Sequence, residues 1–199
     1  MPNRREILQI GIAATAWPLA SQAVRAAGSG SEDPVPLYRV IYDRRFGDSV
    51  EFARRAEALG LPTHAIEGDM TRFWYDDLYH QWQRGPVAIA GLTAHGPMFC
   101  FEQLGRDQGM KLVFRAEHRL AEDRVDHDFL GPTSMLAGSA RVREAGPRWS
   151  ACMADVVARC PSGRAELSAA RAATVTTGGL GNPGAAPLYT WVVAPARNA

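Results

Sequence analysis

Short apolar runs alternate with longer amphipathic segments between residue 37 and residue 117. The apolar runs predict strands at 37–42, 63–68, 86–92 and 111–117. Between them, apolar residues recur every three or four positions, which is the spacing of helices that bury one face. The expected helices are 43–60, 70–85 and 97–107. Residues 86–92 are almost wholly apolar, as a strand covered on both faces must be, so we place this strand at the centre of the sheet.

The pattern changes after residue 118. Residues 120–134 are polar and rich in turn-forming residues, and we interpret them as an excursion over one edge of the sheet. A helical stripe returns at 149–160. The chain then carries two strand-like runs, 172–177 and 187–195, around a glycine-rich loop, which predicts an antiparallel hairpin. The expected fold class is α/β: a single three-layer domain over 37–199, with a mostly parallel sheet, helices on both faces and a C-terminal hairpin.

The first 26 residues follow a different pattern. Arg4 and Arg5 precede an apolar run at 7–20, and small residues follow it. The run is too short and too interrupted to span a bilayer core of roughly 30 Å. A charged start, an apolar middle and small residues before a cut site indicate a signal peptide that is cleaved near Ala26. Residues 27–36 are small, polar and proline-bearing, and we expect a flexible leader there.

The order Arg4-Arg5-x-Ile-Leu resembles the twin-arginine export signal, in which an apolar residue closely follows the arginine pair. Arg25 adds a cation just before the cut, as such signals often do. The resemblance covers residues 1–26 only. It implies that the protein folds in the cytoplasm, crosses the membrane folded through the twin-arginine export machinery, and reaches the periplasm without a membrane anchor. Proteins exported in this way often hold a cofactor or travel with a partner that does. An ordinary secretory signal is the alternative.

Charge and composition narrow the class of protein. Removal of the signal lowers the formal net charge from +1 to −1, so the mature chain has no net basic field to attract nucleic acid or acidic lipid. Apolar residues make up 46% of the chain, and the mature chain of about 170 residues has the length of one domain. The sequence therefore predicts one domain with its own core and no nucleic-acid partner.

The chain has three cysteines, Cys100, Cys152 and Cys160, so they cannot all be paired. On one helix, the α-carbons of Cys152 and Cys160 would lie ~12 Å apart, beyond the ~4.4–6.8 Å of a disulfide. A bond from Cys100 to either of the others stays open. Buried free thiols are the preferred interpretation for a chain that folds in a reducing compartment.

Polar residues follow the ends of the predicted strands. In an open parallel sheet, ligands gather where the C-terminal ends of strands meet the N-termini of helices. The segment 91–99 is the most suggestive, because its glycines allow close approach of the backbone and a helix is expected from Pro97. We expect His95 to act there as a general acid or base. The candidate ligand-binding residues are Asp43, Arg44, Arg45, Asp69, Thr93, Gly96 and His118. Polar loops that only form turns are the alternative.

Three further patterns favour structural interpretations. The run Gly179-Leu-Gly181-Asn-Pro-Gly184 has the spelling of a dinucleotide-binding loop, but no helix is expected after it, so we predict a plain loop and no cofactor. Cys100 could act as a nucleophile with His95 as its base, yet its bulky apolar neighbours favour a place in the core. Residues 117–118 and 126–128 lack the spacing of a zinc site, so we predict no metal.

The second expected helix carries more aromatic residues than one buried stripe needs. Trp74, Leu78 and Trp82 recur every fourth residue and predict its buried face. Aromatic residues outside this stripe, close to arginines, favour a protein interface, and a wide helix wedged between sheet and loop is the alternative. The candidate partner-binding residues are Phe73, Tyr75, Tyr79 and Trp82.

Two functions follow from these patterns. The first is an exported, non-catalytic binding or accessory protein with a periplasmic redox enzyme as its candidate partner, since no complete set of nucleophile, base and orienting residue is recognisable. The second is a small periplasmic enzyme that acts on an anionic or polar molecule at the strand ends, with His95 as acid or base and Arg44 or Arg45 steering the substrate. A cofactor-binding redox protein is disfavoured, because the sequence has no haem-attachment motif or iron–sulfur cysteine set.

Overall fold

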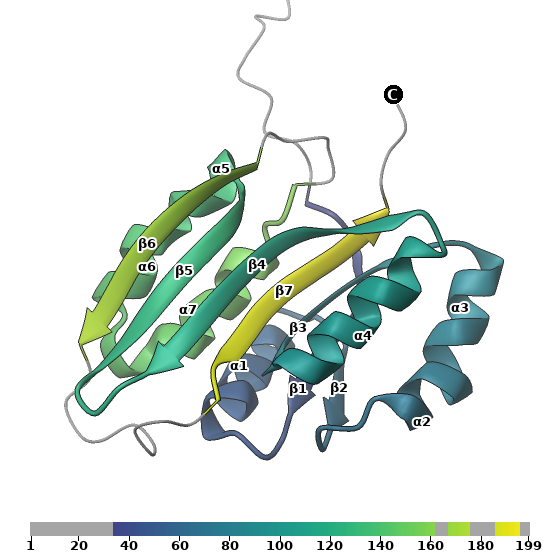
Figure 1. Cartoon of the computed structure of the whole chain (residues 1–199), viewed down its shortest axis with the longest axis horizontal. Helices are drawn as coiled ribbons and strands as arrows, with labels where there is room; N and C mark the ends of the chain where they lie inside the picture. Colours follow the sequence, from purple (N-terminus) through teal and green to yellow (C-terminus); the bar gives the residue numbers. More distant parts are fainter. Residues whose placement is uncertain (1–33, 162–166, 176–185, 196–199) are drawn as a thin grey trace, which may run out of the picture. The chain divides into compact units, whose positions relative to one another are not determined.

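A computed structural model describes residues 34–161, 167–175 and 186–195. These residues form one seven-stranded sheet with helices packed on it (Figure 1). The signal at 1–26, most of the leader at 27–36 and the glycine run at 179–184 lie outside the described residues. Of the expected leader, Val35 donates its backbone N–H to the carbonyl of Cys160 at 2.7 Å, so 34–36 are held against the end of the last helix.

The sheet has the strand order β2-β1-β3-β7-β4-β5-β6. The α/β class is confirmed, but the prediction of a mostly parallel sheet is wrong. Among the described strands, two pairings are parallel, β1 with β2 and β1 with β3, and four are antiparallel. The strands are β1 (Leu37–Asp43), β2 (Thr63–Ile66), β3 (Ala88–Ala94), β4 (Met110–Leu120), β5 (Arg124–Pro132), β6 (Leu167–Val175) and β7 (Leu188–Pro195).

The predicted C-terminal hairpin is also wrong. Strand β7 lies between β3 and β4, in the middle of the sheet, whereas β6 pairs with β5 at an outer edge. The physical reason is visible in β7 itself: Leu188 and Val192 pack into one core, and Trp191 and Val193 pack into the other. A strand that is buried on both faces needs a central place. Strand β7 therefore takes the central position that we assigned to residues 86–92, and β3 lies beside it.

Strand β5 replaces the expected polar excursion. It follows β4 through a tight turn in which Ala121 donates its N–H to the carbonyl of Arg124 at 2.8 Å. Along β5 the side chains alternate: Val125, His127 and Phe129 are buried, and the residues between them are only partly covered. This is the period of a half-buried strand. We missed it because histidine counts as polar in a hydropathy pattern.

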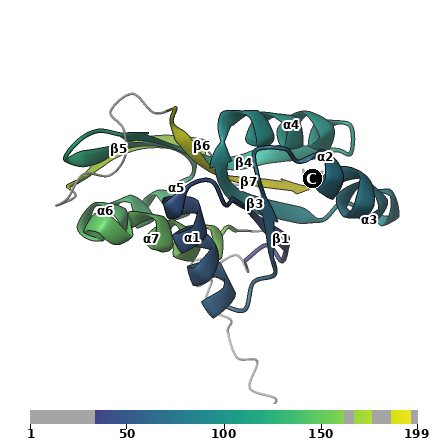
Figure 2. The same cartoon turned by 90° about the horizontal axis from the view of Figure 1, so that it is seen from below.

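Two separate cores lie on the two faces of the sheet. One contains Phe52 and Trp149 and is covered by α1, α5, α6 and α7; the other contains Phe101 and Trp82 and is covered by α2, η1, α3 and α4 (Figure 2). The helical segments are α1 (Gly47–Ala58), α2 (Thr71–Phe73), the π-helical η1 (Trp74–Leu78), α3 (Tyr79–Arg84), α4 (His95–Arg106), α5 (Thr133–Leu136), α6 (Gly138–Glu144), the 3₁₀ turn η2 (Gly146–Arg148) and α7 (Trp149–Val157).

The one-turn π-helix η1 corrects the predicted face of the second helix. In a π-helix the backbone hydrogen bond joins residues five apart, so the buried positions become Phe73, Leu78 and Trp82 instead of a strict repeat of four. Trp74 is only partly buried and meets Trp82 edge to face, with ring centroids 5.6 Å apart. In the described residues, no helix is long and apolar enough to cross a membrane.

Candidate functional site

The strand-end edge that the sequence predicts exists for the first three strands. Strands β1, β2 and β3 run in parallel, so the residues that follow them lie at one edge of the sheet. The order β2-β1-β3 means that the chain crosses from one side of β1 to the other, which leaves a switch point between β1 and β3. Helices α1 and α4 begin there and cover opposite faces. Ligands of α/β sheets bind at such points, so this edge is the first candidate site.

The charged residues at this edge are bonded to one another. Asp43 is fully buried, and its carboxylate accepts three hydrogen bonds from Arg45: from Nε at 2.9 Å, from Nη2 at 2.7 Å and from the backbone N–H at 3.2 Å. The guanidinium of Arg45 covers Gly68, where a Cβ would lie 2.3 Å from Nη2. Arg44 pairs with Glu67 at 2.7 Å. The two arginines that we expected to steer a ligand therefore tie the β1–α1 loop to the β2–α2 loop.

Asp69 and Thr93 also have structural partners. Asp69 accepts the backbone N–H of Thr71 at 2.8 Å and so holds the start of α2. Hydrogen bonding to the side chain of Thr71, and then to its backbone, lowers the pKa of the exposed Asp69 carboxyl. Thr93 is buried: its hydroxyl accepts Trp191 Nε1 at 3.0 Å and donates to the carbonyl of Ala94 at 2.9 Å. The expectation that Thr93 contacts a ligand is wrong, because its side chain points into the core.

The two glycines of the 91–99 segment differ. A Cβ on Gly91 would lie 2.6 Å from the carbonyl oxygen of Ile41 and 2.6 Å from the ring of Trp191, so only glycine fits at this crossing of strand and indole. A Cβ on Gly96 would meet nothing within 4 Å. Within the described part of the chain, Gly96 is therefore exposed at the edge, whereas Gly91 serves packing.

His95 lies at the edge as predicted and is exposed at the first position of α4. Its ring stacks on Phe99, with centroids 5.9 Å apart and an interplanar angle of 17°. The ring of Tyr189 meets it edge to face at 5.4 Å. Burial and the nearby Glu117 raise the pKa of Tyr189. The three rings form a small aromatic platform that includes the imidazole of His95.

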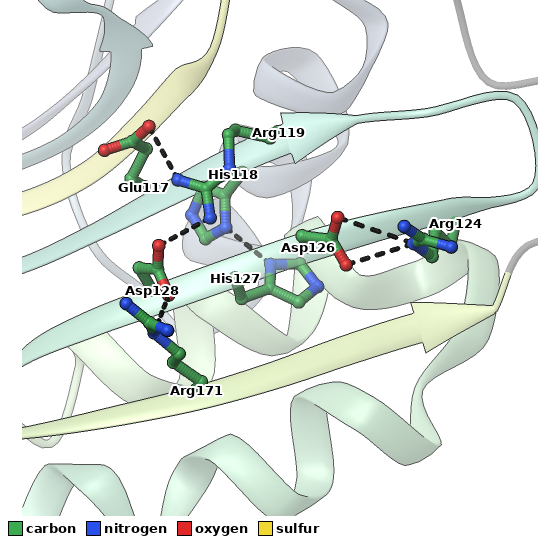
Figure 3. A network of polar contacts seen from close by, with 8 residues as sticks. All are labelled: Glu117, His118, Arg119, Arg124, Asp126, His127, Asp128 and Arg171. Carbon is green, nitrogen blue, oxygen red and sulfur yellow. Dashed lines mark hydrogen bonds and ion pairs between the residues drawn. The ribbon is translucent and has the colours of Figure 1, made fainter.

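The structure places His118 on the face of the sheet that α7 covers, opposite to the face that α4 covers. Its ring is fully buried and forms a pair with His127, with 2.7 Å between the two Nδ1 atoms (Figure 3). His118 Nε2 lies 2.8 Å from the hydroxyl of Thr190, and His127 Nε2 lies 2.9 Å from that of Thr174. The prediction of His118 as a ligand-binding residue is wrong, because position 118 has the same strand parity as the buried Phe114.

The hydrogen bonds fix one direction for the protons of this chain. The hydroxyl of Thr174 donates to the carbonyl of Val142 at 2.9 Å, so it must accept from His127 Nε2. In the neutral form, which burial favours, His127 Nδ1 then has no proton and accepts from His118 Nδ1. His118 Nε2 in turn accepts from Thr190. Both imidazoles are neutral in this arrangement, and every ring nitrogen has a partner.

Burial keeps the pair neutral. Desolvation lowers the pKa of His127 to about 4, with only the carboxylate of Asp126 acting in the opposite direction. Desolvation, and then His127, lower the pKa of His118 well below its usual value. The ring of Trp149 closes the site, at centroid distances of 4.5 Å from His118 and 5.3 Å from His127. The pair is thus a polar part of the core, and both side chains are shielded from solvent.

A charged network covers the opposite face of the same strands. Arg119 bonds Glu117 at 2.9 Å and Asp128 at 2.5 Å, and Asp128 also pairs with Arg171 at 3.0 Å (Figure 3). The bond from Arg119 lowers the pKa of Asp128. These pairs join β4, β5 and β6 side by side. The arginines are exposed and the carboxylates are partly covered, so each pair contributes little stability and suits a sheet face in contact with water.

The predicted partner-binding residues divide into two groups. Phe73 and Trp82 are 3% and 2% exposed and belong to the core, so their assignment to an interface is wrong. Tyr75 and Tyr79 are 63% and 40% exposed and project from η1 and the start of α3. The π-helical turn makes this division, since it shifts the buried face by one residue. Two of the four aromatic side chains are therefore open to a partner.

Sequence reasoning missed two adjoining hollows that are lined by arginines. The first has a volume of about 270 Å³ and lies where α1, α5, α6 and α7 meet; the second, of about 570 Å³, continues between α1 and α7. Both are lined by Arg55, Cys152 and Asp155. The arginines come from α1, α6, η2 and the turn that follows α7, so no local sequence motif predicts the site.

The cysteines are free. Cys100 is exposed, Cys152 is partly covered and Cys160 is fully buried, so the expected core position holds for Cys160 but is wrong for Cys100. Burial raises the pKa of Cys152 and raises that of Cys160 to about 12. Cys100 occurs on the exposed side of α4 because the buried face of that helix passes through Pro97, Met98, Phe101 and Gly105.

Among the described residues, no group of three or more His, Cys, Asp or Glu side chains is placed to hold a metal ion. Comparisons with known proteins found no matching family model, no similar curated protein and no similar solved structure.

Proposed function

We propose that this protein is exported and acts as a non-catalytic binding or accessory protein. One observation carries the proposal: the polar side chains best suited to chemistry are bonded to one another inside the fold. Asp43 holds Arg45, Thr93 holds the indole of Trp191, and the buried histidines hold each other. Side chains that are bonded to one another in this way stabilise the fold and hold its elements in place. They are poorly placed to exchange partners during a catalytic cycle.

The export route is part of the proposal and rests on Arg4 and Arg5 in the signal-like segment 1–26. It predicts passage through the twin-arginine machinery, cleavage near Ala26 and a periplasmic location. A periplasmic redox enzyme that uses the same route is the proposed partner. We also infer a three-layer α/β domain around β1, β3 and β7, where the two cores flank the sheet. Such a domain suits a chain that crosses the membrane already folded.

The arginine pair gives a direct test of the route. Replacement of both residues, R4K with R5K, conserves charge but removes the guanidinium groups that define the signal. We expect the variant to stay in the cytoplasm as the uncleaved precursor, measured by fractionation and mass. Export of the variant at the normal level would instead assign the chain to the ordinary secretory route.

The proposed partner surface consists of Tyr75 and Tyr79. Large aromatic side chains that remain exposed carry much of the binding energy in protein interfaces. Arg72 lies on the same helical segment with a side chain that is 95% exposed, and it supplies a cation beside the two rings. Arg72 pairs with Asp76 only at 3.3 Å, so it can turn to a partner at small cost.

Affinity purification from the native host tests this surface. We expect the protein to retain a partner that the variant Y75S/Y79S loses. The matched control is V175S, because Val175 is 70% exposed on β6, far along the strand order from α3. Loss of the partner with V175S, or its retention with Y75S/Y79S, would contradict the assignment of the surface.

A small enzyme acting on an anionic or polar molecule is the second candidate. The observation that favours it is the contact of the exposed His95 with Tyr189 beside the open position of Gly96. Activity toward a substrate of this class that is lost in H95A and kept in Y75S/Y79S would favour the enzyme. The reverse pattern in the binding assay would favour the accessory protein.

A further inference from the structure

The arginine-lined hollows form a second site, separate from the tyrosine surface. We propose that they bind a small organic anion that has an apolar body and at least two carboxylate or phosphate groups. The site lies between α1, α6 and α7, on the face of the sheet opposite to α4.

The charge of the lining is strongly positive. Two of its arginines have acidic partners: Arg55 bonds Asp155 at 2.7 Å, and Arg54 meets Glu51 at 3.4 Å. The three others have none within the parts of the chain that the structure describes, and all three are exposed. They are Arg141, Arg148 and Arg159. Their guanidinium groups present planar pairs of N–H donors that match carboxylate and phosphate oxygens.

The Arg55–Asp155 pair gives the site a fixed centre. Three hydrogen bonds join the guanidinium to the carboxylate, at 2.7, 3.1 and 3.2 Å, and the pair links α1 to α7 where the two hollows meet. The carboxylate raises the pKa of Arg55. Because Asp155 is already bonded to Arg55, its charge is largely compensated, and the positive field of the remaining arginines faces the hollow.

The first hollow also has an apolar wall. Met135, Ala137 and Val156 line it together with Arg141 and Arg159. Helices α6 and α7 approach closely here, since a Cβ on Gly138 would lie 2.9 Å from Val156. An apolar body fits against this wall while anionic groups reach the arginines at the rim. The wider second hollow is lined mainly by charged residues, which suits the second anionic group.

The modification rate of Cys152 can be used to measure whether the site is occupied. Its thiol lines both hollows, while Cys100 is exposed on α4 and Cys160 is fully buried. A neutral reagent such as iodoacetamide therefore reports occupancy through the modification rate of Cys152. Cys100 in the same molecule serves as the internal reference.

The probes are benzene-1,3,5-tricarboxylate, phenyl phosphate and, as the neutral analogue, benzyl alcohol. We expect the tricarboxylate to slow modification of Cys152 without changing that of Cys100, and benzyl alcohol to have no effect. Removal of one arginine, R141Q or R159Q, should weaken the protection about tenfold, because each removes one charge-assisted hydrogen bond. R143Q is the matched control, since Arg143 is also exposed on α6 but does not line either hollow.

The charge reversal R141E provides a second variant and should abolish protection, with folding checked by circular dichroism. Absence of protection by either anion at 10 mM would overturn the proposal, as would equal weakening by R143Q. Phenyl phosphate carries only one anionic group, so protection by it that equals or exceeds protection by the tricarboxylate would contradict the requirement for two such groups. Preferential protection by the tricarboxylate would support this requirement. None of these outcomes depends on the tyrosine surface, so this site and the proposed accessory function can fail separately.

Discussion

The buried histidine pair should make the stability of this protein fall steeply below pH 6.5. Both imidazoles are neutral in the fold, and burial lowers both pKa values, that of His127 to about 4. In the unfolded chain each histidine takes up a proton near pH 6.5. The unfolded state therefore binds more protons than the folded state between these values. The stability contribution is complete above pH 6.5 and is lost as the pH falls toward the folded pKa.

The magnitude follows from the two titrations. At pH 5 the unfolded form of each histidine is stabilised by about 2 kcal/mol relative to pH 7, while the folded form gains almost no proton. The pair thus accounts for a loss of about 4 kcal/mol between pH 7 and pH 5. This is a large part of the roughly 5–15 kcal/mol that stabilises a domain. His64, whose pKa burial also lowers, adds a loss of the same sign.

Urea denaturation followed by tryptophan fluorescence measures this loss at half-unit steps of pH. The double variant H118Q/H127Q keeps hydrogen-bonding side chains but cannot titrate, so its stability at pH 7 is lower and its pH dependence is flatter. We expect the slope of the free energy of unfolding against pH to differ between the two proteins by about 2 kcal/mol per pH unit between pH 7 and pH 5. The variant H64Q should change this slope far less. Equal slopes for the wild-type protein and the double variant would refute a neutral buried pair.

Two further predictions concern packing and thiol reactivity. G91A should lower the free energy of unfolding by about 1–3 kcal/mol or more, because the new Cβ would meet a backbone oxygen and an indole ring at 2.6 Å, whereas G96A should be nearly neutral in the same denaturation assay. Alkylation followed by mass spectrometry should modify Cys100 first, Cys152 more slowly and Cys160 only after unfolding. Rapid reaction of Cys160 in the folded protein would contradict its buried position.

The sequence predicted helices and strands well where the spacing of apolar residues follows a single helical or strand period. The runs at 37–42 and 111–117 lie within β1 and β4, and the expected helix at 97–107 corresponds to α4. The strand-end edge was also predictable, because parallel strands joined by helices bring their C-terminal ends together. The order and direction of the other strands were not, since the place of β7 is decided by contacts with residues about one hundred positions earlier.

The sequence patterns also did not predict which face of the sheet some side chains lie on. For His118 and His127 this face follows from their neighbours on the same strand. Alternate residues of a strand share a face, so Phe114 and Ala116 place position 118 in the core, and Val125 and Phe129 do the same for position 127. The two positions were missed because histidine counts as polar in a hydropathy pattern and was therefore expected at the surface. Once both segments are taken as strands, this parity predicts an inward side chain at position 118 and at position 127.

The buried pair also constrains the register of the outer strands. Strands β5 and β6 have a helix layer on one face only, and their other face carries the exposed network of Arg119, Asp128 and Arg171. On the covered face, a hydrogen-bonded chain runs from Thr190 of β7 to Thr174 of β6 through both histidines. Directional bonds of this kind hold only one strand register, because a shift by one residue would turn both imidazoles toward water. The histidines are therefore better understood as the feature that aligns four strands than as a catalytic pair, and this assignment requires that their loss disturbs β5 and β6 before it disturbs β1 and β3.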